Sequence, residues 1–321
     1  MVLLAPTRRP TVHKLKVGTV VRCYSLFDRF FPACGIFDYT EGIYHGNSAT
    51  PYEVAQKNQL NYVLNEAACV PGARILEIGC GNGTLLDAVR ERRAKGIGIT
   101  ISPEQFAICR QRDLDVRLLN YVDLDDSWTH QFDAVIANGP IEHFVQPADA
   151  AAGRTDAIYR HFFETCHRAI DPNSPIRRLV TTTIHFVRTP DARNLTKSPF
   201  RFRWGSDNFH WAMLAKSFGG WYPMRGQFAR CAAGLFADIR QTDGTYDYHL
   251  TSEEWLRRIR AVLPTAQGLK ILAGSIPFAL RHPIQYATML TCMLRSESWN
   301  WQFRGPNPPT RLIRQTWAYE S

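Results

Sequence analysis

A chain of 321 residues with 45% apolar and 21% charged side chains has the composition of a globular protein, and its length suits one α/β core with a substantial insertion or cap. The net charge of +9 is spread along the chain, which argues against a dedicated nucleic-acid arm and fits an anionic substrate or an anionic membrane surface equally well. The eight cysteines have no C-x-x-C pair and no metal-ligand spacing, so we expect reduced thiols, no metal site and a cytoplasmic location.

We expect neither a signal peptide nor a membrane-spanning helix from the apolar pattern. At the start of the chain the basic residues follow a very short apolar run, which is the reverse of signal-peptide order. No apolar stretch reaches the roughly 20 residues that a bilayer-spanning helix needs. The positive charge still leaves room for a peripheral contact with an anionic membrane.

Residues 1–66 are predicted to form an N-terminal arm and a helical cap. Apolar and aromatic residues recur with helical spacing over residues 21–31 and again over residues 52–67. The segment between these helices, residues 37–46, is rich in side chains able to line a site. A structured loop without a ligand explains the same composition equally well.

Residues 67–189 are predicted to form a Rossmann-like, cofactor-binding core. A buried strand over residues 75–78 leads into the pattern E-x-G-x-G-x-G, which begins at Glu77, and a helix follows it. Gly79 and Gly81 allow backbone angles that a side chain forbids, and they leave room for a ligand against the main chain. Glu77, at the strand end, can face a bound cation or hydroxyl. The alternate glycines differ from the dinucleotide pattern G-x-G-x-x-G, and a glycine-rich turn without a ligand is the alternative.

Strands and helices alternate through the rest of this core. Further strands are predicted over residues 96–101, 116–119, 132–137 and 178–184, with helices over residues 85–93 and 159–169 and one that starts at Ser102-Pro103. This order is typical of parallel βαβ units, whose ligands bind beyond the carboxyl ends of the strands. Ser102 and Gln105 have the spacing of a helix capping box, which explains both residues without a ligand.

Residues 190–222 interrupt this rhythm with aromatic and basic side chains, and we interpret them as an inserted lid or substrate cap. A surface excursion is the alternative. In a lid, the aromatic residues would contact an apolar substrate and the bases would meet a phosphate headgroup or diphosphate. The aromatic residues are Phe200, Phe202, Trp204 and Trp211, and the bases are Arg193, Lys197, Arg201 and Arg203.

Residues 223–321 are predicted to complete the core sheet and to add C-terminal helical segments. A sheet-like piece is predicted over residues 232–239, and a helix that opens at Thr251 extends to residue 262. From residue 268 onward the segments are amphipathic and rich in arginine and tryptophan.

The glycine pattern is similar to the first motif of S-adenosylmethionine-dependent methyltransferases. Residues 35–185 and 219–260 further resemble the cyclopropane-fatty-acid synthase family, including its mycolic-acid branches. The matching pieces are Tyr39-Thr40, Ala55-Gln56, the run from Leu76 to Gly81, the run from Gly98 to Gln105, Glu142-His143, Gly219-Gly220 with Pro223, and Tyr248 before Trp255. The resemblance implies a Rossmann-like class I methyltransferase of the α/β class, with a mostly parallel seven-stranded sheet, helices on both faces and an inserted lid.

The resemblance also implies S-adenosylmethionine as the cofactor and S-adenosylhomocysteine as its product. Tyr39, Thr40 and the glycine loop would hold the methionine end, and residues near 100–105 would surround the ribose and adenine. An amide oxygen of Asn120 can accept a hydrogen bond from the adenine amine. The full set of implied cofactor residues is Tyr39, Thr40, Gln56, Glu77, Gly79, Cys80, Gly81, Thr100, Ile101, Ser102, Gln105, Asn120, Asn138 and Gly139.

In the cyclopropane synthases a bound bicarbonate, held by a Cys, a Glu, a His and a Tyr, removes the proton that is lost after methyl transfer. Glu142 and Tyr248 match the Glu and the Tyr. Glu41 takes the Cys position, where a second carboxylate would repel bicarbonate and could itself serve as the base. If Glu41 and Glu142 face each other, we expect one of them to stay protonated near neutral pH.

Two histidines are further catalytic candidates. The His of the family falls near Thr182, and His185, three residues on, is a candidate substitute for it, with a purely structural histidine as the alternative. His143 is a candidate to orient Glu142, although a position at the start of a helix explains it almost as well.

The leading hypothesis is an S-adenosylmethionine-dependent C-methyltransferase acting on an alkene-bearing apolar substrate, either an unsaturated fatty acyl lipid or an isoprenoid. Methyl transfer to carbon would be followed by proton loss to a carboxylate base. The alternatives are a small-molecule O- or N-methyltransferase and a non-catalytic protein that binds S-adenosylmethionine or lipid; the intact glycine loop argues against the last. As partners we expect the apolar substrate and no nucleic acid, with a homo-oligomer left open.

Overall fold

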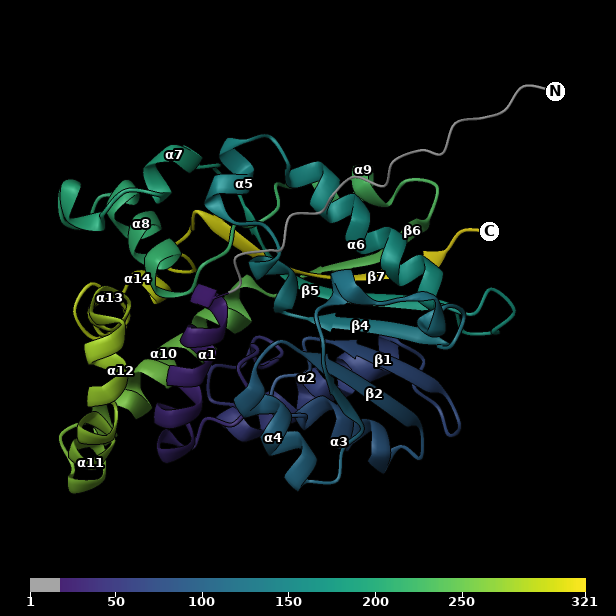
Figure 1. Ribbon diagram of the computed structural model, residues 1–321, viewed down its shortest axis with the longest axis horizontal. Coiled ribbons are helices and arrows are strands. Elements are labelled where there is room, and N and C mark those ends of the chain that lie inside the picture. Colours follow the sequence, from purple (N-terminus) through teal and green to yellow (C-terminus); the bar gives the residue numbers. More distant parts are fainter. Residues whose placement is uncertain (1–17) are drawn as a thin grey trace.

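Seven strands form one sheet in the computed structural model, which describes residues 18–321 (Figure 1). The strands are β1 (Arg74–Ile78), β2 (Lys95–Thr100), β3 (Val116–Leu118), β4 (Ala134–Asn138), β5 (Arg178–Phe186), β6 (Phe236–Asp243) and β7 (Thr310–Tyr319). Their order is β3-β2-β1-β4-β5-β7-β6. The first five run parallel, and β7 pairs antiparallel with both β5 and β6. The predicted mostly parallel, seven-stranded α/β sheet is therefore confirmed.

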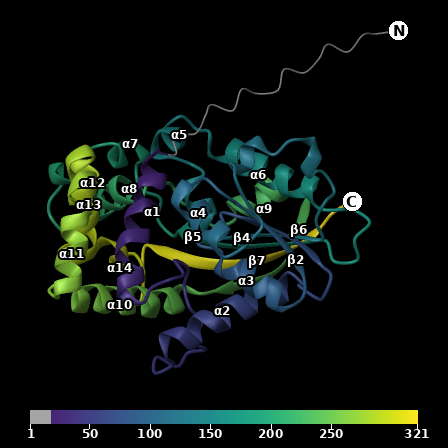
Figure 2. The ribbon, with the colours of Figure 1, turned by 60° about the horizontal axis from the view of Figure 1, so that its bottom comes forward.

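Helices cover both faces of the sheet and form a block at one end of it (Figures 1 and 2). The α-helices are α1 (Gly18–Phe30), α2 (Tyr52–Glu66), α3 (Thr84–Glu91), α4 (Pro103–Gln111), α5 (Pro147–Ala151), α6 (Thr155–Ala169), α7 (Ala192–Leu195), α8 (Asp207–Ser217), α9 (Gln227–Ala232), α10 (Thr245–Val262), α11 (Ala266–Gly274), α12 (Ile276–Arg281), α13 (Pro283–Leu294) and α14 (Ser298–Trp301). The part of the predicted arm that falls on residues 1–17 lies outside the described residues. Within residues 18–321, none of the helices combines the length and the apolarity that a bilayer span requires.

Alternating side chains of the central strands build two apolar layers. Ile75 of β1 and Ile136 of β4 pack with α2 and α3, whereas Leu76 and Val135, one position away, pack with α6 on the other face. Successive side chains of a strand point to opposite faces, so a strand whose residues are all apolar needs cover on both sides. This requirement explains why β1 and β4 lie in the middle of the sheet.

Residues 190–222 contain α7 and α8, and α8 is a helix of the core. Its side chains Phe209, Trp211 and Met213 are buried, and it packs against α13 and α14. Two of the aromatic residues that we assigned to substrate contact, Phe200 and Trp204, are exposed on the surface.

The structure corrects two details of residues 223–321. The helix expected to open at Thr251 begins at Thr245, whose amide donates a hydrogen bond to the side chain of Asp243 (2.8 Å). The sequence analysis did not locate the last strand, β7, because its many polar residues resemble those of a surface segment. In the structure β7 lies between β5 and β6.

Candidate cofactor pocket and active site

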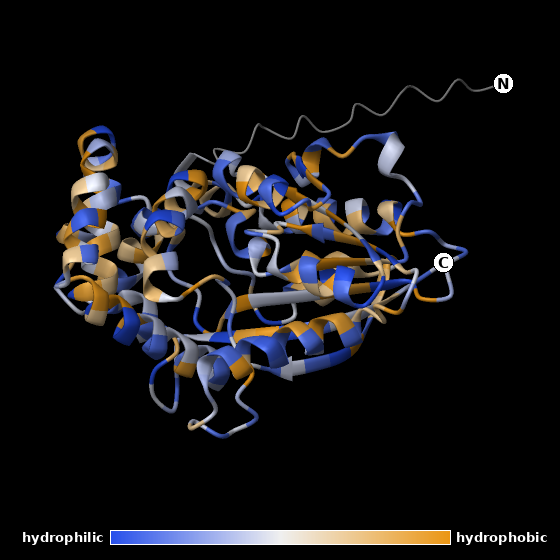
Figure 3. Ribbon diagram, turned by 90° about the horizontal axis from the view of Figure 1, so that it is seen from below, coloured by the Kyte–Doolittle hydropathy of each residue, from blue (hydrophilic) through white to orange (hydrophobic). Residues whose placement is uncertain are grey.

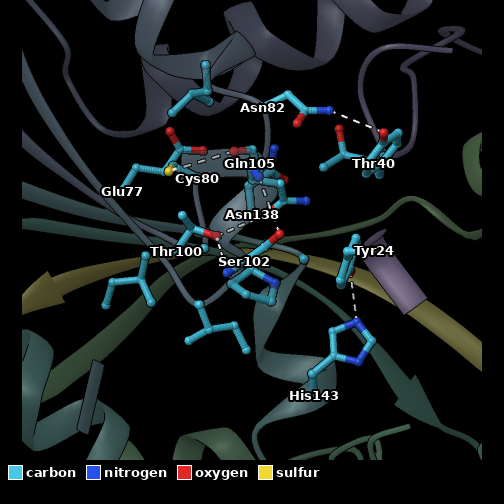
Figure 4. A pocket seen from close by; sticks show the side chains of 18 of the residues that line it. Tyr24, Thr40, Glu77, Cys80, Asn82, Thr100, Ser102, Gln105, Asn138 and His143 are labelled. Carbon is cyan, nitrogen blue, oxygen red and sulfur yellow. Dashed lines mark hydrogen bonds between the residues drawn. The ribbon is translucent and has the colours of Figure 1, made fainter. Parts of the chain in front are cut away.

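A pocket opens at the carboxyl ends of β1, β2 and β4, where the strand order reverses (Figure 4). This is the position at which open α/β sheets bind ligands. Thirteen of the predicted cofactor residues line it: Tyr39, Thr40, Glu77, Gly79, Cys80, Gly81, Thr100, Ile101, Ser102, Gln105, Asn120, Asn138 and Gly139. Gln56 is not among the lining residues; it lies behind them and donates a hydrogen bond to the Thr40 carbonyl (3.0 Å).

The glycine loop after β1 brings its main chain to the pocket surface. Gly79 has φ +75°, and a Cβ there would lie 2.5 Å from Cβ of Pro140, so this glycine is required by packing. Gly81 has φ +52°, and a Cβ there would meet no atom within 4 Å. Because Gly81 lines the pocket, that open space is where a ligand can lie against the backbone.

The Glu77 carboxylate, at the end of β1, is buried with one oxygen unpaired. Its Oε2 atom has no hydrogen-bond partner among residues 18–321. Burial raises the pKa of Glu77 well above its ordinary value, and the nearby Asp38 raises it further. A ligand that brings hydroxyl or ammonium donors would satisfy this oxygen, as the nucleoside and amino-acid parts of S-adenosylmethionine do. The unpaired Glu77 oxygen therefore fits the hydrogen-bond donors of the expected cofactor.

The segment after β2 has a structural and a pocket-lining role at once. The Ser102 hydroxyl accepts a hydrogen bond from the Gln105 amide (3.3 Å) and caps α4, which is half of the predicted capping box; the Ser102 amide bonds the Thr100 hydroxyl (3.2 Å) instead of the Gln105 side chain. The Thr100 hydroxyl donates to the Gln105 side-chain oxygen (3.0 Å), so the three side chains hold one another. Asn120, which also lines the pocket, accepts a long hydrogen bond from the Val122 amide (3.4 Å), and its side-chain carbonyl has a second lone pair free for a ligand.

Polar residues of α1 and the glycine loop complete the wall, and the sequence did not single them out. The Tyr39 hydroxyl donates to Asp28 (2.6 Å), and Asn82 donates to both of them (3.2 Å each). Tyr24 of α1 also lines the pocket and bonds His143 (Figure 4). Asp28 and Tyr24 lie within an amphipathic helix and belong to no local motif, so only the tertiary fold reveals them.

Glu142 lines the pocket a few residues after the end of β4. It follows β4 in a short 3₁₀ turn (Pro140–His143), and its Oε1 atom accepts a hydrogen bond from the Ile184 amide of β5 (2.9 Å). The Trp221 amide donates a hydrogen bond to the main-chain carbonyl of Glu142 (3.0 Å). This bond joins the end of the inserted segment to Glu142. Burial raises the pKa of Glu142 to about 8, and the charge of Glu41 adds to the rise.

Glu41 also lines the pocket, but it has a partner that the sequence did not indicate. Its carboxylate pairs with Arg314 of β7 (2.8 Å), which also pairs with Asp247 of α10 (3.0 Å). Only 2% of the Glu41 side chain and 4% of the Arg314 side chain are exposed. Burial raises the pKa of Glu41, and Arg314 opposes that rise. The Arg314 guanidinium therefore compensates the charge of Glu41, which the expected pair of carboxylates did not include.

We expect Arg314→Met to destabilise the fold by about 3–5 kcal/mol, because it leaves Glu41 as an uncompensated buried charge. Urea unfolding measures the loss. Arg311→Met on the same strand is the matched control: its side chain is 39% exposed and lies 3.9 Å from Asp243, so a change within about 0.5 kcal/mol is expected. Adding Glu41→Gln to Arg314→Met should recover part of the loss. Equal stability of the two single variants would contradict the role of the pair.

The two candidate histidines have different positions. The His143 Nε2 atom bonds the Tyr24 hydroxyl (2.9 Å), so the residue does not orient Glu142 through a direct hydrogen bond. Burial lowers the pKa of His143 to about 4, and its ring is neutral at pH 7. His185 is not among the lining residues, and its ring packs on Phe228 (5.0 Å between centroids). Residues three apart on a strand face opposite sides, so Thr182 lines the pocket and His185 cannot.

Tyr248 reaches the pocket from α10. Its ring stacks on Phe303 (4.3 Å between centroids), which fixes the direction of the hydroxyl. Burial raises the pKa of Tyr248 well above its ordinary value, and the charge of Glu142 raises it further, so the phenol keeps its proton and can donate. Residues 190–222 contribute no lining residue to this pocket within the described chain, and their role as a lid stays a prediction.

Comparison with known proteins finds cyclopropane synthases and also O-methyltransferases of ubiquinone biosynthesis. Residues 14–210 match the family described as mycolic acid cyclopropane synthetase. Cyclopropane mycolic acid synthase 2 of Mycobacterium leprae (strain TN) is 29% identical over 153 residues, 44% of this chain and 46% of that protein. Cyclopropane-fatty-acyl-phospholipid synthase of Escherichia coli (strain K12) is 34% identical over 96 residues, 28% of this chain and 24% of that protein. These matches span less than half the length of either curated relative.

The solved structures extend the likeness to nearly the whole chain. A crystal structure of a mycolic acid cyclopropane synthase complexed with SAH and CTAB aligns with a TM-score of 0.67 at 18% identity. The alignment covers 94% of this chain and 98% of that chain. At this identity the likeness establishes a shared fold, and it agrees with the predicted class.

Proposed function

This chain belongs to the mycolic acid cyclopropane synthetase family, and from that premise we propose that it is an S-adenosylmethionine-dependent C-methyltransferase acting on an apolar substrate with an alkene. One observation carries the proposal. Glu142, a carboxylate whose pKa burial raises to about 8, lines the same pocket as the glycine loop, beside apolar side chains. The apolar lining residues include Val20, Val21, Phe37, Leu119, Phe144 and Leu312.

We assign the polar and the apolar lining residues of the pocket to different ligands. Glu77, the glycine loop and Asn120 would hold the cofactor, whose sulfonium supplies an electrophilic methyl group. The apolar residues of α1 and β7 would exclude water and receive the alkene. When the methyl group bonds to one alkene carbon, the positive charge forms on the other, and Glu142 would take the proton that is lost from the substrate. Tyr248 would donate its hydroxyl toward that carboxylate.

We expect kcat/KM to rise with pH as Glu142 loses its proton. A general base is active when deprotonated, so below an apparent pKa of about 8 the rate should fall by up to about tenfold per pH unit. The bound sulfonium is cationic and stabilises the Glu142 carboxylate, which lowers the pKa of Glu142 in the complex. The rise of kcat with pH should therefore occur at lower pH than the rise of kcat/KM. A methyl-transfer assay across neutral to mildly alkaline pH measures both. A kcat/KM profile that is flat through this range would argue against a buried carboxylate base.

Incubation with methyl-labelled S-adenosylmethionine and a total lipid extract, followed by mass spectrometry, tests the function itself. We expect the label in an unsaturated lipid or isoprenoid, bound to carbon and resistant to hydrolysis. Label in a methyl ether or amine of a small molecule would instead support the alternative O- or N-methyltransferase. Binding of the cofactor with no transfer to any fraction would favour a non-catalytic binding protein.

A further inference from the structure

The helices α11, α12 and α13 carry a cluster of exposed large apolar side chains. Leu269 is 60% exposed, Ile276 53%, Leu280 77% and Ile284 72%. Leu280 and Ile284 are the two most exposed large apolar side chains of residues 18–321. Ile276 and Leu280 lie one turn apart on α12, and Ile284 follows at the start of α13. Such grouping marks an interaction surface rather than scattered exposure.

The charge of the same segment has a single sign. Residues 255–296 contain no aspartate and no glutamate. Lys270, Arg281 and Arg295 are exposed there, and none of the three forms an ion pair within the described chain. Elsewhere on the surface arginines commonly pair with carboxylates, as Arg154 does with Asp149. Unpaired cations beside exposed apolar side chains are the features with which a peripheral protein meets anionic headgroups and the acyl layer beneath them.

The inner face of this helical unit is fixed to the wall of the pocket. Gln285 of α13 accepts a hydrogen bond from Arg22 (2.7 Å) and donates to the Thr19 carbonyl (2.8 Å), both in α1. Val20 and Tyr24 of α1 line the pocket. In Figure 1 the unit lies at the left end of the molecule, together with the segment around α7 and α8, and Figure 3 shows the same end from below, where hydrophobic and hydrophilic residues both occur.

We propose that the outer face of α11–α13, comprising Leu269, Ile276, Leu280, Ile284, Lys270 and Arg281, docks on an anionic lipid bilayer. The apolar side chains enter the boundary between headgroups and acyl chains, and the two cations meet lipid phosphates. The contact places a bilayer beside the α1 wall of the pocket. It requires no particular reaction, so it stands independently of the proposed methyl transfer.

Co-sedimentation with two kinds of vesicle tests this surface. The wild type should bind phosphatidylcholine vesicles that contain phosphatidylglycerol on the order of tenfold more tightly than phosphatidylcholine alone. Ile284→Glu and Leu280→Glu should each weaken binding to the mixed vesicles by about tenfold or more. Ile239→Glu is the matched control, because Ile239 is 50% exposed on β6, away from this unit, and should bind as the wild type. Lys270→Gln and Arg281→Gln should each cost about fivefold on the mixed vesicles.

The variants must remain folded for the comparison, and unchanged thermal unfolding together with unchanged binding of S-adenosylhomocysteine checks this. Three results would overturn the proposal. The first is a wild type that sediments with neither kind of vesicle, and the second is equal binding of Ile284→Glu and Ile239→Glu to the mixed vesicles. In the third, the wild type is a dimer that Leu280→Glu converts to a monomer with no loss of vesicle binding, which would show that a second copy covers this face.

Discussion

Glu142→Gln is expected to reduce turnover by roughly 10²-fold or more while leaving the affinity for S-adenosylhomocysteine unchanged. The amide keeps the size of the side chain and can still accept the hydrogen bond from Ile184, but it cannot take a proton from the substrate. Single-turnover methyl transfer measures the chemical step, and calorimetry measures binding. The expected pattern is therefore a large loss in rate at constant affinity.

Two comparisons make this result specific. Glu164→Gln changes an exposed carboxylate of α6 in the same way and should retain full activity. Added bicarbonate should not restore turnover in Glu142→Gln, because we assign the proton transfer to the side chain. If Glu142→Gln keeps near-normal turnover on the true substrate, Glu142 is structural. If bicarbonate restores the rate, a bound anion is the base.

Gly81→Val should abolish measurable binding of S-adenosylmethionine and S-adenosylhomocysteine. Its added side chain would project into open pocket space, where we expect the ligand to lie against the main chain. Gly79 is a poorer test, because any side chain there collides with Pro140 and disturbs the fold itself. Calorimetry with S-adenosylhomocysteine measures the loss directly.

The matched control for this variant is Gly72→Val. Gly72 also has a positive φ (+84°) and open space around its Cβ position, but it lies outside the pocket. Both variants should lose a similar amount of stability, about 1–3 kcal/mol, since a β-branched residue is strained in this backbone region. Only Gly81→Val should lose binding. Unchanged affinity in Gly81→Val would refute the assignment of the pocket.

Some of the predicted site residues are encoded in local patterns, whereas Tyr39, Glu41 and Tyr248 were predicted only from the resemblance to the family. The glycine pattern after β1, the capping box at Ser102 and the Glu142-His143 pair all lie within a few residues of a strand end. Since the carboxyl ends of parallel strands meet at one edge, local patterns were enough to bring these residues together. The alternation of strand side chains could also have excluded His185, because an odd step from Thr182 leads to the opposite face.

The part that the sequence did not predict depends on contacts between distant segments. Glu41 and Arg314 are separated by 273 positions, and neither belongs to a pattern that names the other. The sequence predicted two neighbouring carboxylates, but it did not predict that Arg314 would pair with one of them. Tyr24 likewise reaches the pocket from α1, and Asp28 of the same helix holds the lining residues Tyr39 and Asn82 by hydrogen bonds. No local sequence pattern indicates that these residues belong to the site, because only the tertiary contacts bring them there.

The position of β7 has a consequence for how the protein is made. β7 is the last strand in the chain, yet it lies between β5 and β6. As the ribosome synthesises the chain, β6 emerges long before it has a partner, and the edge of β5 stays open. Arg314 arrives with the same late segment, so Glu41 is without its counter-ion until then. A nascent chain at this stage would present unpaired strand edges, which makes it a substrate for chaperones during the final part of its synthesis.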